Sequence, residues 1–186
     1  MRIIGGVLKG KKISLPSNKS TRPLKDLVKE SIFNILDHSN KFDLTIKNSN
    51  ILDLFSGTGS FGFECISRGS KKITFIENYD EALKILKKNI NHLKVKDKCE
   101  IINQDIFKFI NSEFNFNDKF DLIFIDPPYK NDQVEKLIKR IKNKEILDDK
   151  GVIIIHRHKK NKDNLSNCLN ILEERVYGIS KLIIGF

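Results

Sequence analysis

The sequence predicts an α/β fold in which a mostly parallel, doubly wound sheet carries helices on both faces. Apolar runs of strand length alternate with amphipathic segments of helix length through most of the 186 residues, and such alternation is typical of this class. A glycine-rich segment follows the first of these runs, and acidic residues stand at or near the carboxyl ends of four of them. Ligands of such sheets lie beyond the carboxyl ends of the strands, so the acids predict where a site forms.

The expected elements follow from hydrophobic periodicity and from turn residues. Residues 1–15 predict a hairpin, and residues 24–37 predict a helix. Runs rich in Ile, Leu and Phe then predict parallel strands at 50–55, 72–77, 99–103, 120–125 and 151–156. Amphipathic segments between and after them predict helices at 60–68, 80–93, 105–112 and 132–143. The tail predicts two more strands, 170–176 and 179–185, which turn at Gly178.

Length and composition indicate one domain over residues 1–186, because 39% hydrophobic content supports one substantial core and no Pro/Gly/Ser-rich linker interrupts the chain. Within it, we expect residues 1–40 to form a basic hairpin and helix extension, and residues 41–186 to form the core that carries the site. No apolar run is long enough to cross a bilayer and the start lacks a signal-peptide pattern, so a cytoplasmic location is expected.

Three cysteines are isolated along the chain, at Cys65, Cys99 and Cys168. Their spacing contains no C-x-x-C pair, which argues against a zinc site and against a disulfide framework. We expect these thiols to act as small buried apolar residues, and we expect no metal site.

A glycine-rich turn lies between the first expected strand and the helix after it. Gly57, Gly59 and Gly62 match the G-x-G-x-x-G spacing, and Glu77 falls where an acid grips a ribose. This spacing alone does not separate a nicotinamide dinucleotide from S-adenosylmethionine. Asp53 favours the second, because a carboxylate suits a cationic ligand better than a pyrophosphate. The alternative for Asp53 is a turn or helix-capping role.

The segment Asp126-Pro127-Pro128-Tyr129 directly follows the apolar run 122–125. A carboxylate at Asp126 can hold the N–H groups of a planar amine and favour the positive charge that develops on its nitrogen. The two prolines fix φ and lack N–H groups, so they form a rigid turn whose carbonyls can face the same amine. Tyr129 offers a flat face for stacking on a base. The segment favours an amino-methyltransferase, and the alternative is an ordinary turn after a strand.

The net charge of +10 is unevenly distributed, because residues 1–29 carry net +7. Such a segment predicts a polyanion contact surface, and the alternative is a merely solvated basic end. The expected contacts are Lys9, Lys11, Lys12, Arg22, Lys25 and Lys29. A smaller basic cluster follows the strand near 151–156 and comprises Arg157, Lys159, Lys160 and Lys162. His156 and His158 are expected to be structural or solvated rather than metal ligands.

Several segments, taken in order, carry a resemblance to a known family. They are Met1-Arg2-Ile3-Ile4-Gly5-Gly6, residues 9–12, Thr21-Arg22-Pro23, residues 26–36, 53–59 and 67–69, and Asp126-Pro127-Pro128-Tyr129. The chain resembles the class I S-adenosylmethionine methyltransferases, and more closely the RsmD-type family that methylates a guanine N2 in small-subunit (16S) ribosomal RNA. One departure is Leu27, which stands where the family usually has an arginine. Either one basic contact with RNA is missing, or Lys25 or Lys29 replaces it.

The resemblance implies a Rossmann-like, seven-stranded sheet whose last strand inserts antiparallel. It implies S-adenosyl-L-methionine as the cofactor, with Glu77 on the ribose hydroxyls and with Asp105 and the Ile106 backbone on the adenine. For Asp105 the alternative is an N-cap, and both roles are compatible. The implied cofactor-binding set is Asp53, Phe55, Ser56, Gly57, Thr58, Gly59, Glu77, Asn78, Asp105 and Ile106. The implied catalytic set is Asp126, Pro127, Pro128 and Tyr129.

The implied substrate is small-subunit ribosomal RNA, within an assembled or assembling 30S particle, and a monomeric enzyme is expected. Five alternatives stay open, and the first is an amino-methyltransferase that acts on another RNA. A nicotinamide oxidoreductase shares the glycine loop but leaves the proline segment unexplained. A DNA amino-methyltransferase normally needs a target-recognition region for which this chain has no room. A protein-glutamine methyltransferase typically has Asn first in the tetrapeptide. A non-catalytic RNA-binding protein would not need so complete a set of site residues.

Overall fold

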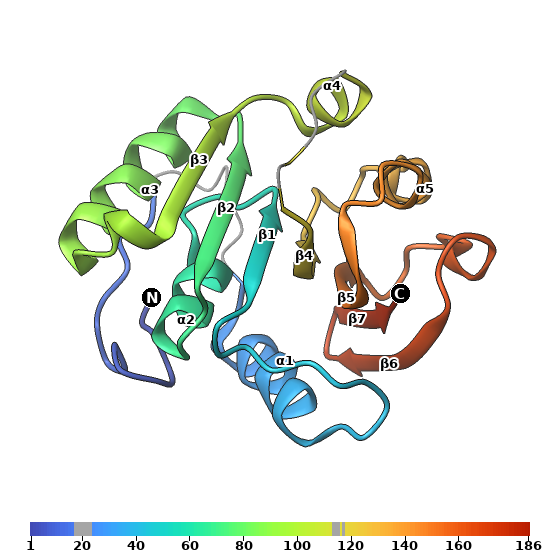
Figure 1. Ribbon diagram of the computed structural model, residues 1–186, viewed down its shortest axis with the longest axis horizontal. Helices are drawn as coiled ribbons and strands as arrows, with labels where there is room; N and C mark the ends of the chain where they lie inside the picture. The colour runs from blue at the N-terminus through green and yellow to red at the C-terminus, as the bar shows by residue number, and fades with distance from the viewer. Residues whose placement is uncertain (17–23, 113–115, 117) are drawn as a thin grey trace.

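The computed structural model describes residues 1–16, 24–112, 116 and 118–186. A single sheet of seven strands runs through it in the order β3-β2-β1-β4-β5-β7-β6 (Figure 1). The strands are β1 (Asn50–Leu54), β2 (Lys72–Glu77), β3 (Cys99–Asn103), β4 (Phe120–Ile125), β5 (Leu147–His158), β6 (Ile171–Tyr177) and β7 (Ser180–Gly185). The α-helices are α1 (Asp26–His38), α2 (Ser60–Ser67), α3 (Asp80–Leu93), α4 (Ile106–Asn111) and α5 (Val134–Asn143).

The five strands from β1 to β5 are mutually parallel, and β7 pairs antiparallel with both β5 and β6. This confirms the α/β class and the antiparallel insertion that the resemblance implied. One strand is longer than expected, because β5 begins at Leu147 rather than near 151. Leu147 pairs with Phe120 before a register shift in the β4–β5 ladder, so the early part of β5 is joined to the sheet across an irregularity.

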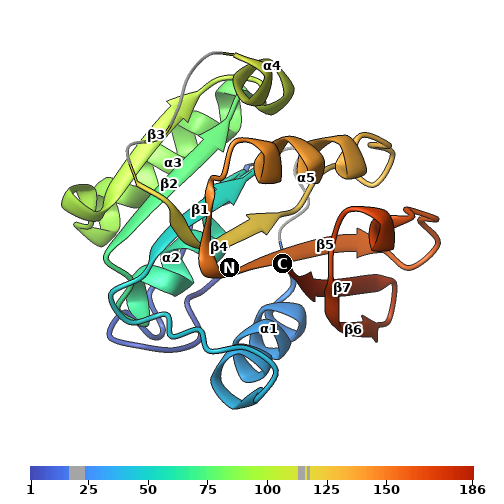
Figure 2. The same ribbon diagram turned by 45° about the vertical axis from the view of Figure 1, so that its right-hand side comes forward.

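Two helical layers cover the sheet, and strand periodicity decides what each face buries. In β1, Ile51 packs in the core under α1, α2 and α3, whereas Leu52 and Leu54 pack in the core under α4 and α5. Figure 2 shows α4 and α5 on one side of the sheet and α1 on the other. All the β1 residues named here are buried, as expected for a central strand of a two-sided parallel sheet.

The amino-terminal segment is less regular than the expected hairpin. It closes through one isolated antiparallel bridge between Arg2 and Lys12, supported by bonds from Ile3 N to the Lys11 carbonyl at 3.0 Å and from Gly10 N to the Ile3 carbonyl at 2.9 Å. Ile3 and Ile13 are buried in the same core as α1 and α2. The segment is therefore held by packing and by a few bonds rather than by a ladder.

A buried glutamate joins this segment to α2. Glu64 is fully buried, and its carboxylate accepts hydrogen bonds from Ile4 N at 2.9 Å and Gly5 N at 2.7 Å. Lys29 Nζ lies 3.6 Å from the same carboxylate and donates to the Arg2 carbonyl at 2.8 Å. Because Lys29 is also fully buried, the expectation that it contacts RNA is wrong: its charge neutralises Glu64.

Cys65 and Cys168 are buried and Cys99 is partly buried, and all three thiols are free. Burial raises the pKa of Cys65 well above its usual value and that of Cys99 to about 12. Both thiols therefore remain protonated and unreactive at neutral pH. None of the helices in the part of the chain that the structure describes is long and apolar enough to span a membrane.

Candidate functional site

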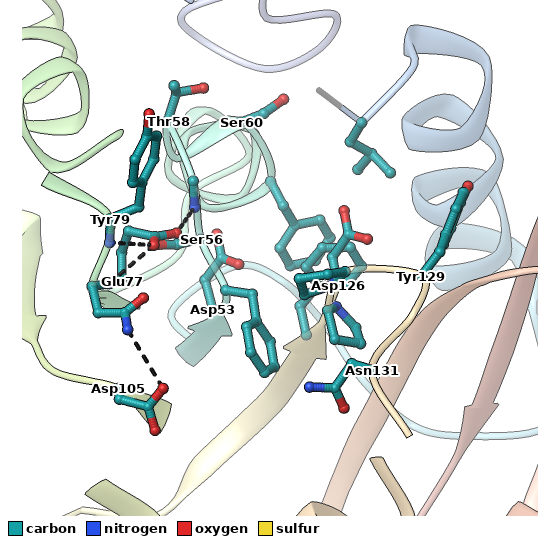
Figure 3. Close-up of a pocket in the computed structure, with 18 of the residues that line it drawn as sticks. Asp53, Ser56, Thr58, Ser60, Glu77, Tyr79, Asp105, Asp126, Tyr129 and Asn131 are labelled. Atoms are coloured by element: carbon teal, nitrogen blue, oxygen red, sulfur yellow. Dashed lines mark hydrogen bonds between the residues drawn. The ribbon is translucent and has the colours of Figure 1, made fainter. Parts of the chain in front are cut away.

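A cavity of about 540 Å³ opens at the carboxyl ends of the central strands, which is the size of a small-molecule site (Figure 3). It runs from the glycine-rich turn to the proline segment. Its lining comprises Leu24, Asp53, Phe55, Ser56, Gly57, Thr58, Ser60, Phe61, Glu77, Asn78, Tyr79, Asp105, Phe107, Phe124, Asp126, Pro127, Pro128, Tyr129 and Asn131. Nearly all the expected cofactor and catalytic residues thus meet in one place.

Two glycines of the turn have different reasons to be glycine. Gly57 has φ of 54°, lines the cavity, and has no atom within 4 Å of where a Cβ would stand. Its side therefore faces open space that a ligand can approach. Gly59 has φ of 84°, does not line the cavity, and a Cβ there would meet Phe63 and Leu86 at 2.6 Å. Gly59 thus serves the backbone turn and packing, and protein side chains rather than a ligand occupy the space beside its Cα.

Glu77 fixes the shape of this turn from the end of β2. One carboxylate oxygen accepts the N–H of Gly57 at 2.7 Å, and the other accepts those of Asn78 and Tyr79, both at 2.9 Å. A carboxylate has about four acceptor positions, so Glu77 keeps capacity for a further donor. The bonds within the lining are drawn in Figure 3.

Asp105 caps α4, which is the alternative role expected for it. Its Oδ1 accepts the N–H groups of Phe107 and Lys108 at 3.0 Å each, and its Oδ2 lies 3.4 Å from Asn78 Nδ2. Ile106 is buried in the core and does not line the cavity. Phe107 does, and its ring lies 6.0 Å from that of Phe55. Two aromatic rings therefore flank this end, and Phe107 is not among the residues expected from the sequence.

Asp53 is 1% exposed, at the end of β1 (Figure 3). Its Oδ2 accepts the N–H of Gly62 at 3.1 Å. Desolvation by burial raises the pKa of Asp53 well above its usual value, opposed by the Gly62 bond and reinforced by the charges of Asp126 and Glu77. The ionised form of a carboxylate in this environment becomes fully favourable only when a cation binds beside it. The cavity is thus complementary to a positively charged ligand.

The lining contains no lysine or arginine among the described residues, although the chain carries +10 overall. Four acids face this space instead, namely Asp53, Glu77, Asp105 and Asp126. An anionic pyrophosphate would have to approach them without a compensating cation. This arrangement argues against the nicotinamide dinucleotide alternative.

Asp126 stands at the other end of the cavity, with its side chain 15% exposed. Its Oδ1 lies 2.8 Å from His156 Nδ1, and its backbone N–H donates to the Leu54 carbonyl at 3.4 Å. Tyr129 is partly buried and its ring meets the His158 ring edge to face, with centroids 4.8 Å apart. The proline segment is therefore held on its inner side by the end of β5.

Arg157 corrects the expected second basic cluster. It is 1% exposed, because its guanidinium pairs with Asp163 at 2.7 Å and donates to the Asn131 carbonyl at 2.6 Å. A longer bond of 3.4 Å reaches the Pro128 carbonyl. Arg157 is therefore a buried side chain that binds the carbonyls of the turn after Asp126, and it does not contribute to a surface patch. Lys159, Lys160 and Lys162 remain exposed.

Most of the expected RNA contacts that the structure describes are open to solvent. Lys9, Lys11, Lys12 and Lys25 are exposed. Arg22 lies outside the described residues. Leu24, just before α1, lines the cavity, so the amino-terminal extension reaches the candidate active site.

Comparison with known proteins agrees with this geometry. A family model described as "Conserved hypothetical protein 95" matches residues 1–185. The chain belongs to this family. Its curated relatives include Ribosomal RNA small subunit methyltransferase D of Haemophilus influenzae, 33% identical over 96% of this chain and 90% of the relative. Putative rRNA methyltransferase YlbH of Bacillus subtilis is 30% identical over 99% and 97%. The resemblance inferred from the sequence is confirmed.

Solved structures show the same fold as this member of the Conserved hypothetical protein 95 family. A putative methyltransferase from Escherichia coli superposes with a TM-score of 0.84 at 25% identity, covering 100% of this chain and 96% of that one. A putative methylase from Haemophilus influenzae gives 0.78 at 30% identity, covering 99% and 96%. The seven-stranded methyltransferase fold is therefore confirmed.

The site residues that were not expected from the sequence lie mainly beside those that were. Phe107 and Tyr79 each fall within two positions of an expected contact, so their proximity was a usable signal. Arg157 had a weaker signal, because its charge suggested a surface position, and His156 was expected only to be structural or solvated. Leu27, where the family usually has an arginine, is 64% exposed. The buried Lys29 cannot supply a charge to RNA there, whereas Lys25, just before α1, is exposed.

Proposed function

We propose that this chain transfers a methyl group from S-adenosylmethionine to the exocyclic N2 amine of a guanine in small-subunit (16S) ribosomal RNA. The chain is an S-adenosylmethionine-dependent methyltransferase of ribosomal RNA, by its family and its relatives. The guanine and its N2 atom are the proposed part. An assembled or assembling 30S particle as substrate, and a cytoplasmic location, belong to the same proposal.

One observation carries the proposal: the acid-lined cavity continues without interruption from the glycine turn to Asp126 and Tyr129. Its first half suits a cationic cofactor, and its second half suits a neutral planar amine. A dinucleotide oxidoreductase would need positive or neutral surroundings for a pyrophosphate, and a purely RNA-binding protein would not need a deep acidic cavity.

The residues fit S-adenosylmethionine along the first half. Asp53 would face the cationic methionine part, and the open side of Gly57 gives that part room to approach. Glu77 would accept a ribose hydroxyl with its remaining acceptor position. Phe55 and Phe107 would flank the adenine, with Asn78 and Asp105 at its polar edge. Ser56 and Thr58 complete the turn.

The second half would hold the amine. S-adenosylmethionine, when bound, supplies an electrophilic methyl group on a sulfonium. Asp126 would accept an amine N–H and stabilise the positive charge that grows on nitrogen, and it can take the proton that leaves. The Pro128 carbonyl already accepts the Asn131 N–H at 2.8 Å, so the Pro127 carbonyl is our candidate for the second amine contact. Tyr129 would stack on the base, worth about 1–3 kcal/mol.

The basic amino-terminal extension would bind the RNA backbone. Lys9, Lys11, Lys12 and Lys25 are exposed on it, and Arg22 is proposed with them from the sequence alone. Phosphate contacts position the RNA without reading sequence. The guanine itself has to leave its stack to enter the cavity, which costs least in a loop.

The deciding experiment is methyl transfer to small ribosomal subunits from cells that lack the enzyme, followed by nucleoside analysis. We expect N2-methylguanosine in small-subunit RNA and none in large subunits, duplex DNA or protein. Asp126→Ala should lower single-turnover transfer by more than about 100-fold, while calorimetric affinity for S-adenosylmethionine stays within a few-fold. Labelling of DNA or of protein glutamine without small-subunit RNA would overturn the proposal.

A further inference from the structure

His156 makes two side-chain hydrogen bonds although it is almost completely enclosed. It follows the apolar run of residues 153–155 in β5, and it is 2% exposed. Its Nδ1 lies 2.8 Å from Asp126 Oδ1, and its Nε2 lies 2.9 Å from Ser180 Oγ. Both ring nitrogens are thus paired, which is the usual requirement for burying an imidazole.

The three residues come from three adjacent strands. Asp126 follows β4, His156 lies near the end of β5, and Ser180 begins β7, and these strands are neighbours in the sheet. Ile125 is paired with Ile155, so the next residues, Asp126 and His156, come level with each other. The contact therefore follows from the register of the sheet and does not depend on a flexible loop.

The chemistry of the two contacts assigns a proton to each donor. An ionised carboxylate only accepts hydrogen bonds, so His156 Nδ1 carries the proton that points to Asp126. In the neutral ring Nε2 is then an acceptor, and the Ser180 hydroxyl donates to it. Ser180 is 4% exposed and is not part of the cavity lining. Asp126 therefore fixes the Nδ1–H tautomer, and the Ser180 hydroxyl, which can donate or accept, satisfies Nε2 and holds the ring in place.

The order carboxylate, imidazole, hydroxyl also occurs in serine hydrolases, but here the carboxylate rather than the hydroxyl is the end that faces the cavity. In a hydrolase the hydroxyl faces the substrate and the carboxylate is buried. In this chain Asp126 lines the cavity, and Ser180 is enclosed behind the histidine. Ser180 is therefore not placed to attack a substrate as a nucleophile, and the group that these three residues present to the cavity is the Asp126 carboxylate.

We propose that His156, which donates from Nδ1 and is held at Nε2 by Ser180, is a positioning residue that orients the Asp126 carboxylate toward the acceptor amine. The proposal rests on the proposed function of the cavity as an amine methylation site. The bond to His156 engages Oδ1 and restricts rotation of the carboxylate. A reacting group held in one orientation needs no reordering when the amine arrives, and small misplacements of such groups cost large factors in rate.

Two substitutions separate the two ends of the ring. His156→Asn places an amide nitrogen near the position of Nδ1 and can still donate to Asp126. His156→Gln reaches toward the position of Nε2 and leaves Asp126 without that donor. The control is His92→Asn, because His92 is exposed on α3, away from the cavity lining.

The kinetic test is single-turnover methyl transfer to saturating small subunits. We expect His156→Gln to reduce activity on the order of 10- to 100-fold, with KM for the particle and calorimetric affinity for S-adenosylmethionine within a few-fold. His156→Asn should recover most of the rate, and His92→Asn should match the unsubstituted protein. Equal rates for all three variants would overturn the positioning role. No methylation of small subunits by the unsubstituted protein would instead overturn the proposed function.

A spectroscopic test is independent of the substrate. Nuclear magnetic resonance on isotope-labelled histidine reports which ring nitrogen carries the proton, and the chain has four histidines, so His156→Asn assigns the signal. We expect a proton on Nδ1 of His156. Ser180→Ala, a small change if the glutamine variant fails to fold, should leave that proton in place, because Asp126 accepts it, and should lower the rate, because the ring loses its partner at Nε2. An Nδ1 without a proton, or a Ser180→Ala protein with an unchanged rate, would overturn the proposal.

Discussion

Asp53 shows at the scale of one residue how the site trades stability for binding. Burial raises its pKa well above the ordinary value of 3.8. Between the ordinary pKa of 3.8 and the raised pKa, the folded protein holds a proton on Asp53 that the unfolded chain has released. The contribution of Asp53 to the free energy of unfolding therefore falls as pH rises through this interval. This is the opposite of a carboxylate paired with a cation. At neutral pH the unliganded protein keeps a costly buried acid for its ligand.

Asp53→Asn should therefore stabilise the unliganded protein at neutral pH, by on the order of 1–3 kcal/mol, because it removes a buried charge and still accepts the Gly62 N–H. The gain should vanish below about pH 4. The same variant should bind S-adenosylmethionine more weakly. Thermal melts against pH, with and without cofactor, measure both effects. A neutral-pH melting temperature below that of the unsubstituted protein would contradict the assignment of a costly buried charge.

Glu77 has a structural role as well as a proposed binding role, since it bonds the N–H groups of Gly57, Asn78 and Tyr79. Glu77→Ala should weaken cofactor binding by more than removal of the ribose hydrogen bonds alone, each bond to a charged group being worth roughly 1.5–3 kcal/mol. Glu77→Gln keeps one acceptor oxygen and should weaken binding less. Calorimetry on both variants tests this ordering, and equal affinities for the two would limit Glu77 to a contact with the ligand.

At the scale of elements, helix α3 links the amino-terminal extension to the glycine turn. Asn89 is fully buried, and its Nδ2 donates to the carbonyls of Ser14 at 3.2 Å and Thr58 at 3.1 Å. Its Oδ1 accepts the Ser14 N–H at 2.9 Å. One side chain therefore connects the segment proposed to grip RNA with the turn proposed to hold the cofactor.

Asn89→Ala should lower the free energy of unfolding by about 1–3 kcal/mol, because it leaves buried backbone groups unsatisfied. It should also weaken cofactor binding, since nothing then anchors the Thr58 carbonyl to α3. Asn91→Ala on the same helix is the matched control, because Asn91 is exposed. Chemical denaturation and calorimetry give the two readouts. If both variants melted alike, Asn89 would not be the link between these elements.

At the scale of the whole molecule, the two signs of charge occupy different places. The cavity is lined by acids, whereas exposed lysines occur on the amino-terminal extension at Lys9, Lys11 and Lys12. A polyanion is therefore attracted to the extension while the cavity stays suited to a cation and a neutral amine.

Replacing Lys9, Lys11 and Lys12 with Gln should weaken RNA association and flatten its salt dependence, by about 0.7 log units per log unit of salt for each single-stranded phosphate that the variant no longer neutralises. Cofactor affinity should hardly change. The control removes the same charge from α5 on the opposite face of the sheet, through Lys136, Lys139 and Arg140, which are exposed. If the salt dependence of the α5 variant were flattened as much as that of the extension variant, binding would reflect net charge rather than this surface.

The sequence by itself determined the α/β class, nearly all strand and helix positions, and the meeting of Asp53, Glu77, Asp105 and Asp126 at one edge. These features follow from local periodicity and from the rule that parallel strands end on the same side. Strand parity also contained an unused signal: His156 shares the face of Ile154, and Asp126 shares that of Phe124, both in the core under α1.

Only the tertiary structure decided which charges are buried. Lys29 and Arg157 look like surface cations in the sequence, but a carboxylate from another segment pairs with each one. Glu64, distant along the chain, pairs with Lys29, and Asp163, beyond a turn, pairs with Arg157. The bond from His156 to Asp126 depends likewise on strand register, and the different roles of Gly57 and Gly59 depend on which side chains surround each one. Burial and pairing are properties of contacts between separate segments, so residue type and local spacing do not specify them.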